Sequence, residues 1–174
     1  MRPHAVPASG RRRTQLALER AELRFVARVV ADGGIGPWRA TAEPRLAAAH
    51  ASFNRQGRLA RGVAADLVVA LSDKPTRDGY WRVIEAQPDP TWPAFWLRLS
   101  GRALSPYRAE PLFLLAWSAW RLDDLQLAGS AAVGALTEDP GHRAASMLLA
   151  MLRAGVRPDR LPSLANGSVV ASAS

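Results

Sequence analysis

The amino-acid composition predicts an all-α protein. The chain contains 33 Ala and 22 Leu against 12 Val and 2 Ile, and alanine and leucine lead the scale of helix propensity. Apolar residues recur three and four positions apart, and no long stretch alternates with the period of two that marks a strand. We therefore expect a bundle of about seven to eight helices.

The length of 174 residues suits a single domain that buries its core without help from metal or disulfides. Residues 1–13 are polar and basic and contain two prolines, and residues 161–174 have the composition of a disordered tail. The predicted organisation is thus a disordered N-terminus at 1–13, a helical domain at 14–160 and a disordered tail at 161–174.

Start and stop signals predict four helices in the first half of the domain. Thr14 is a suitable N-cap, Gly33-Gly34 ends the first helix, and the next residues up to Thr41 read as a loop. The expected ranges are 14–32, 43–56, 58–71 and 76–86. The first helix carries two adjoining apolar stripes, one of Leu16, Leu23, Val26 and Val30 and the other of Leu18, Phe25 and Val29.

Four further helices are expected at 91–104, 110–122, 124–137 and from Asp139-Pro140 to about Leu152. Trp92, Phe95 and Trp96 share one stripe, which suits either a ligand platform or the core. We favour the core, because each aromatic side chain buries about 150–250 Å². The helix at 110–122 is apolar on almost every side, so it needs neighbours around it and is expected at the centre of the bundle.

Small residues on the helix at 124–137 are typical of a tetratricopeptide-like hairpin. Ala128, Ala132 and Ala135 lie on one face, and Asp139-Pro140 follows at the expected distance. No second copy is visible 34 residues away. We expect tetratricopeptide-like packing of one hairpin, without a repeat array.

Motifs for catalysis, metals and cofactors are missing from the sequence. The chain has no cysteine, and its three histidines, His4, His50 and His142, lie in separate segments without ligand spacing. We expect no cofactor or metal and assign no catalytic residue. An enzyme would need a pocket that gathers the polar residues near Asp73 with a distant group such as His50 or Tyr107, so a non-enzymatic protein is favoured without being decided.

The densest polar cluster contains Asp73, Arg77, Asp78 and Trp81. These side chains could bind a polar ligand. In the alternative interpretation, which we favour, Asp73 or Thr76 caps the helix at 76–86 and Arg77 pairs with a carboxylate.

Positive charge is concentrated in the first third of the chain. Residues 1–61 contain 12 Arg and 4 acidic residues, and the other 113 residues are neutral in sum. The candidate contacts to nucleic acid are Arg11, Arg12, Arg13, Arg20, Arg24 and Arg28. A solvated basic helix face explains the same pattern and is commoner.

The longest apolar run, Leu112 to Trp120, is much shorter than the ~20 residues that cross a bilayer. We expect a soluble, cytoplasmic protein without a membrane partner. The oligomeric state is not indicated by the sequence.

Two blocks between residues 58 and 160 carry a family resemblance. They comprise Leu71-Ser72-Asp73, Arg77-Asp78 and Trp81, and then Pro106-Tyr107, Pro111, Leu114-Leu115-Ala116, Ala119-Trp120, Leu127-Ala128, Ala135-Leu136, Asp139-Pro140-Gly141-His142 and Leu148-Leu149. In this order they resemble the actinobacterial family called domain of unknown function 4192. Asp123-Asp124-Leu125 departs from the glycine-rich turn usual there, and the strand-containing first half of the family has no counterpart, so the chain resembles the C-terminal half standing alone. The resemblance implies a helical fold and supplies no activity.

These features predict a non-enzymatic helical module that binds a protein partner. The alternative is an accessory protein that contacts nucleic acid through its basic first third. Buried tryptophans and the lack of an exposed apolar surface would argue against the first, and failure to bind DNA or RNA at low salt against the second.

Overall fold

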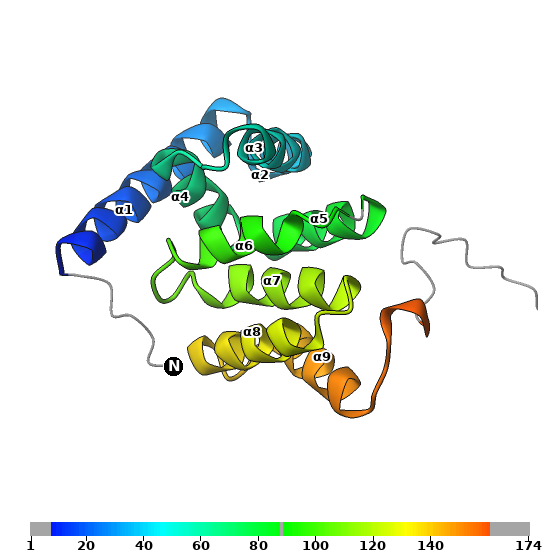
Figure 1. Cartoon of the computed structure of the whole chain (residues 1–174). Helices are drawn as coiled ribbons and strands as arrows, with labels where there is room; N and C mark the ends of the chain where they lie inside the picture. Colours follow the sequence, from blue (N-terminus) through cyan, green and yellow to red (C-terminus); the bar gives the residue numbers. More distant parts are fainter. Residues whose placement is uncertain (1–7, 88, 161–174) are drawn as a thin grey trace, which may run out of the picture.

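The computed structural model describes residues 8–87 and 89–160 and confirms the all-α fold (Figure 1). Within these ranges the chain forms nine α-helices and one short 3-10 helix. They are α1 Ala8–Ala31, α2 Ile35–Ala40, α3 Ala42–Gln56, α4 Arg61–Ala70, α5 Lys74–Ala86, α6 Trp92–Ser100, α7 Ala109–Arg121, α8 Leu125–Glu138, α9 Arg143–Arg153 and η1 Pro158–Arg160. Of the ends predicted to be disordered, residues 1–7 and 161–174 lie outside the described residues, whereas residues 8–13 belong to α1.

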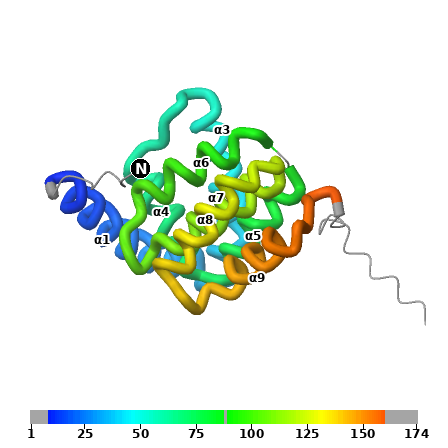
Figure 2. Tube along the Cα trace, turned by 60° about the horizontal axis from the view of Figure 1, so that its bottom comes forward, coloured from blue at the N-terminus to red at the C-terminus, as the bar shows by residue number. Residues whose placement is uncertain are grey.

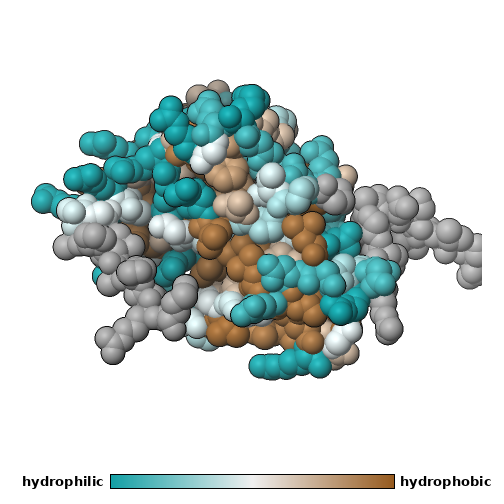
Figure 3. All heavy atoms as spheres, in the orientation of Figure 1, coloured by the Kyte–Doolittle hydropathy of each residue, from teal (hydrophilic) through white to brown (hydrophobic). Residues whose placement is uncertain are grey.

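From α6 to α9 the helices stack in chain order. α7 lies between α6 and α8 and packs on both, and α9 packs on α8 (Figures 1 and 2). α1 packs along α4, and α3 contacts α5, so the first four helices form one end of the molecule. On the face shown in Figure 3, hydrophobic surface gathers over the stacked helices from α6 to α8, and the end formed by α1 to α3 is mainly hydrophilic.

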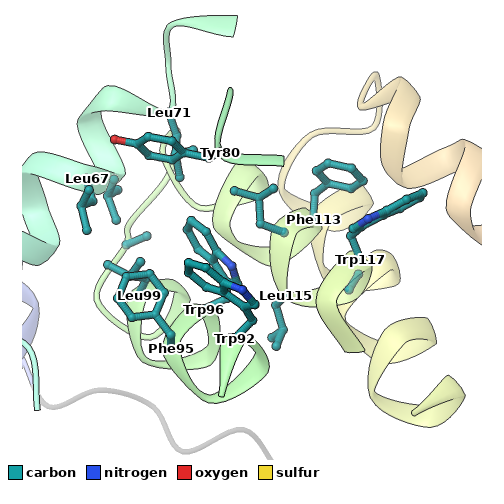
Figure 4. Packing of buried hydrophobic residues seen from close by; sticks show 14 of the residues in the cluster. Leu67, Leu71, Tyr80, Trp92, Phe95, Trp96, Leu99, Phe113, Leu115 and Trp117 are labelled. Atoms are coloured by element: carbon teal, nitrogen blue, oxygen red, sulfur yellow. The ribbon is translucent and has the colours of Figure 1, made fainter. Parts of the chain in front are cut away.

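The centre of the core is α7, as its apolar sequence predicts. Every residue from Phe113 to Trp120 is buried, because α6 covers one side of the helix and α8 the other. Trp92, Phe95 and Trp96 of α6 are at most 2% exposed, which confirms that their stripe belongs to the core (Figure 4). Trp117 and Trp120 of α7 are equally buried. The protein-partner hypothesis therefore cannot rest on the tryptophans.

Two predictions for the N-terminal third are wrong. α1 begins at Ala8, so Thr14 lies inside the helix and is not its N-cap. The Thr14 hydroxyl donates to the Gly10 carbonyl of the preceding turn instead of accepting from a backbone N–H at the helix start. The predicted loop after Gly34 is the helix α2. Its residue Trp38 is buried, and a T-shaped contact with Phe25 fixes it against α1.

Three helix boundaries differ from the predicted ones by three or four residues. α4 begins at Arg61, three residues later than predicted, and α6 ends at Ser100, four residues earlier. The last long helix begins at Arg143 instead of Asp139-Pro140. Asp139 ends α8 and accepts from Gly141 N, and the Nδ1 atom of His142 accepts from Ala145 N to cap α9.

The α7–α8 hairpin is the most extensive helix pair among the described residues. A single hairpin of this kind does not define a tetratricopeptide unit, so that assignment stays a prediction. Within residues 8–87 and 89–160, no helix combines the length and the apolar character that a bilayer crossing demands.

The environment of His50 makes the folding stability depend on pH. Its ring stacks on Trp92, with centroids 3.5 Å apart, and its Nε2 atom lies 2.8 Å from the Thr91 hydroxyl oxygen. Burial lowers the pKa of His50 from its ordinary value, and the nearby carboxylate of Asp89 offsets this only in part. In the unfolded chain, His50 therefore takes up a proton near pH ~6.5, whereas in the folded chain it does so only at lower pH. The contribution of His50 to folding stability is thus fully present above pH ~6.5 and is lost as the pH falls below that value.

We expect the free energy of unfolding, measured by urea denaturation, to decrease as the pH is lowered from about 7.5 to about 5.5. The variant His50→Phe keeps an aromatic ring against Trp92 and removes the titrating group, so its stability should fall less over this range. Equal slopes for the variant and the parent would contradict this role of His50.

Candidate functional site

Four exposed aliphatic side chains, including the three most exposed large ones of the described residues, lie on one face of α1. Leu16, Leu23, Val26 and Val30 are 43%, 73%, 60% and 74% exposed. Leu16, Leu23 and Val30 follow each other at intervals of seven, and Val26 lies three residues after Leu23, so the four side chains share one face. We call these four residues the α1 outer stripe.

The second predicted stripe of α1 faces the protein. Leu18 is buried together with Ala21, and Phe25 is half-buried against Trp38. The packing of α1 on α4 uses this inner face and leaves the α1 outer stripe uncovered by the described part of the chain. An apolar surface therefore exists, though not where the tryptophans suggested.

The six arginines predicted to contact nucleic acid have different environments. Arg24 donates from Nε and Nη2 to Asp66 Oδ1 at 2.9 and 2.7 Å, and Arg28 donates to Asp66 Oδ2 at 3.3 Å. These two side chains join α1 to α4. The other four are exposed and form no ion pair within residues 8–87 and 89–160; they are Arg11, Arg12, Arg13 and Arg20.

Within the predicted polar cluster, Asp73 is a helix cap held by an arginine. Its Oδ2 atom accepts from Thr76 N at 3.1 Å, which caps α5, and from the Thr76 hydroxyl at 2.8 Å. Arg39 of α2 donates to both carboxylate oxygens, at 2.6 and 2.9 Å. The hydrogen bonds from Arg39 are the main reason that the pKa of Asp73 lies below its ordinary value.

Arg77 is the second centre of the cluster, and it begins a chain of contacts that links three helices. It donates to Asp78 at 2.8 Å and to Glu110, at the start of α7, at 3.3 Å. The other oxygen of Glu110 lies 3.1 Å from His142 Nε2, and His142 caps α9 through its Nδ1 atom. The chain of contacts ties α5 to α7 and α9.

Trp81 is half-buried and packs against the core. Its ring makes T-shaped contacts with Phe113 and Trp117, at centroid distances of 5.0 and 4.7 Å. Asp73 and Arg77 thus engage separate partners, and only Arg77 contacts Asp78. The geometry agrees with the capping and ion-pair interpretation of the cluster.

The groups that an enzyme would have to add lie elsewhere. His50 contacts Thr91 and Trp92, and the Tyr107 hydroxyl donates to Glu22 of α1. Burial, together with this hydrogen bond, raises the pKa of Tyr107 to about 12. In the described ranges, no three His, Asp or Glu side chains come together in a way that could hold a metal ion.

The family described as domain of unknown function (DUF4192) matches residues 2–159. The chain belongs to this family. No curated protein and no solved structure matches the chain.

The DUF4192 match extends beyond the region in which the sequence motifs carried the resemblance. It includes residues 2–57, so α1, α2 and α3 belong to the matched segment as much as the later helices do. In this DUF4192 chain, the contacts from Arg77 to Glu110 and from Glu110 to His142 join the two motif blocks. Helix capping and helix pairing thus account for Asp73, Arg77 and His142 of the motifs, and Leu71, Leu114, Leu115, Ala128 and Leu148 are buried in the core.

Three partners in the polar cluster were missed by sequence reasoning. Arg39 sits in a segment predicted as a loop, and Glu110 and His142 are separated from Arg77 by 33 and 65 positions. A local pattern contains no information about such pairings. The only available signal was the position of His142 directly after Asp139-Pro140-Gly141, where a helix start was expected.

Proposed function

We propose that this chain is a non-enzymatic helical module that binds a protein partner through the α1 outer stripe. The supporting observation is the line of four exposed aliphatic side chains on one face of a 24-residue helix. Large apolar side chains gathered on one exposed face are typical of interaction sites, whereas singly scattered ones are normal. Among the other exposed aliphatic residues, Leu97 lies on α6 and Leu125 and Val133 on α8, so no other described helix carries four of them.

The spacing of the stripe favours an amphipathic helix as the partner. Leu16, Leu23 and Val30 occupy successive equivalent heptad positions, and Val26 takes the position three residues after Leu23. A helix with its own apolar seam packs on such a line by placing side chains between those of α1.

Charge favours an acidic partner over a second copy of the chain. By helical spacing, Arg12, Arg13 and Arg20 lie on or beside the face of the stripe, against two carboxylates there, Glu19 and Glu22, and Glu22 already accepts from the Tyr107 hydroxyl. A second copy would bring the same arginines together and would add another net charge of +8. A partner helix with carboxylates beside its apolar seam would pair with them.

The test uses a synthetic amphipathic peptide of about three heptads, with leucine at the seam and glutamate on both flanks. We expect the protein to bind this peptide in fluorescence anisotropy, and Leu23→Glu to weaken binding by at least about tenfold. A peptide with lysine on the flanks should bind much more weakly. The matched control is Val133→Glu, because Val133 is similarly exposed but lies on α8.

Several results would overturn this proposal. No binding of the acidic peptide, or equal weakening by Leu23→Glu and Val133→Glu, would remove the stripe as the docking surface. Self-association that Leu23→Glu abolishes would make a second copy the occupant. Cosedimentation with anionic vesicles that requires the stripe would make the occupant a lipid surface.

Contact with nucleic acid is the second candidate, supported by the four exposed arginines of α1 that pair with no described carboxylate. Retention on duplex DNA at low salt should then decrease steeply with salt, with a slope of about −0.9 per neutralised phosphate. The combined change of Arg12, Arg13 and Arg20 to glutamine should flatten that slope, while Leu23→Glu should leave it unchanged.

A further inference from the structure

We propose that a pocket between α1, α3 and α4 binds a small apolar carboxylate. The proposal is independent of the protein-partner function, because the pocket lies on the inner side of α1, opposite the α1 outer stripe. Ala21 and Phe25 line it from α1, and both point away from the stripe by helical spacing.

The cavity has a volume of about 510 Å³. Sites for small molecules usually measure about 300–1,000 Å³ and are lined mainly by apolar side chains with a few polar groups. Its apolar wall includes Phe25, Trp38, Ala49, Leu59, Val63 and Leu67. Val63 is 42% exposed, so the pocket is open to solvent on the α4 side.

One of the polar groups in the wall is a buried donor without an acceptor. The indole N–H of Trp38 is buried and donates to no described group. Trp81 and Trp96 also have an unpartnered indole N–H, but neither of them lines the pocket. A buried donor without an acceptor is costly, and an acceptor on a ligand would remove that cost.

Tyr80 supplies a second donor. It is 1% exposed and lines the pocket. Figure 4 shows this hydroxyl directed away from the Trp92 and Trp96 rings. Burial raises the pKa of Tyr80 far above its ordinary value, so the phenol keeps its proton and remains able to donate.

The charges at the pocket favour an anion. Asp66 is the acidic residue in the lining, and it already accepts from Arg24 and Arg28. Arg45 is held more weakly, by one long contact of 3.5 Å to Asp32, and its guanidinium carbon lies 5.5 Å from the centroid of the Trp38 ring. A carboxylate beside Arg45 can therefore form a charge-assisted hydrogen bond while an apolar body fills the cavity.

Octanoate and 1-octanol are suitable probes, since they share an apolar chain and differ in the charged group. We expect octanoate to bind in isothermal titration calorimetry with higher affinity than 1-octanol. Arg45→Gln should weaken octanoate binding about tenfold or more, the usual effect of losing a hydrogen bond to a charged group, and should leave the affinity for 1-octanol unchanged.

Two alanines of α3 provide a matched pair of variants. Both are exposed, but Ala48 lines the pocket and Ala47 does not. Ala48→Trp should fill the cavity and abolish binding of both probes, and Ala47→Trp should have no effect. Circular dichroism checks that both variants fold.

A spectroscopic readout locates the ligand without relying on affinity. In a ¹H–¹⁵N correlation spectrum, the indole signal that disappears in Trp38→Phe should shift on addition of octanoate, while the other indole signals stay in place. Absence of octanoate binding, equal affinity for the two probes in the parent, an equal effect of Ala47→Trp and Ala48→Trp, or a stationary Trp38 signal would each overturn the proposal.

Discussion

Replacing Leu115 with aspartate is expected to destabilise the protein by about 5 kcal/mol. Leu115 is 1% exposed in the middle of α7, where α6 and α8 surround the helix. The substitution removes the burial of a leucine and places a carboxylate where no partner is available. Because a domain of this size is stable by only about 5–15 kcal/mol, the variant should be largely unfolded or melt far below the parent.

The control for this experiment is Val133→Asp. Val133 lies on α8 and is 52% exposed, so its aspartate stays hydrated and the cost should be within about 1 kcal/mol. Thermal melting followed by circular dichroism compares the two variants. If Leu115→Asp melts at the same temperature as the parent, α7 is not the centre of the core.

The helices could be predicted from the sequence wherever burial follows the helical period. In α6 the spacing of Trp92, Phe95, Trp96 and Leu99 predicts one buried face, and all four side chains are buried. The apolar character of α7 on all sides predicts its central position. In both helices the pattern has one physical explanation, which is that large apolar side chains cluster away from water.

The pattern was insufficient where two structures explain it equally well. α1 has two apolar stripes, and nothing local determines which of them packs on α4. The segment around Trp38 contains glycine and proline, which are typical of loops, and its short helix is held by contacts of Trp38 with Phe25 and Arg45. The tertiary contacts decide the structure in both places.

The local sequence predicted the helix cap at the candidate polar cluster but not the pairings between distant residues, because tertiary contacts decide those pairings. Asp73 was expected to cap a helix and does so, whereas its pairing with Arg39 spans 34 residues and leaves no trace in the local sequence. The basic excess of the first third is visible in the composition, but Asp66 of α4 engages Arg24 and Arg28. Distant carboxylates thus decide which arginines can meet a partner.

Among variants that remove one charged side chain, we expect Arg121→Met to lose the most folding stability. Glu85 of α5 is buried, accepts from Trp117 Nε1 at 2.5 Å and pairs with Arg121 Nε at 3.3 Å. Arg121→Met keeps an apolar chain of similar length but leaves this carboxylate without its counter-charge. Because a buried charge that loses its partner is poorly solvated, we expect a loss of about 3–5 kcal/mol in the free energy of unfolding.

The double variant Arg121→Met with Glu85→Gln tests the physical cause. Glutamine removes the charge and keeps a carbonyl oxygen that can accept from Trp117, so the second change should recover about 2 kcal/mol or more of that loss.

The comparison pair is Arg82 and Glu43, whose side chains are 69% and 46% exposed and lie 3.2 Å apart. Arg82→Met should cost less than about 1 kcal/mol, because both charges of this pair are solvated. Urea denaturation measures all three variants. Equal costs for Arg121→Met and Arg82→Met, or no recovery in the double variant, would mean that Glu85 is solvated well enough to need no partner. Recovery would show that the stability of the α5–α7 contact depends on neutralising one buried carboxylate, whose hydrogen bond to Trp117 aligns the two helices.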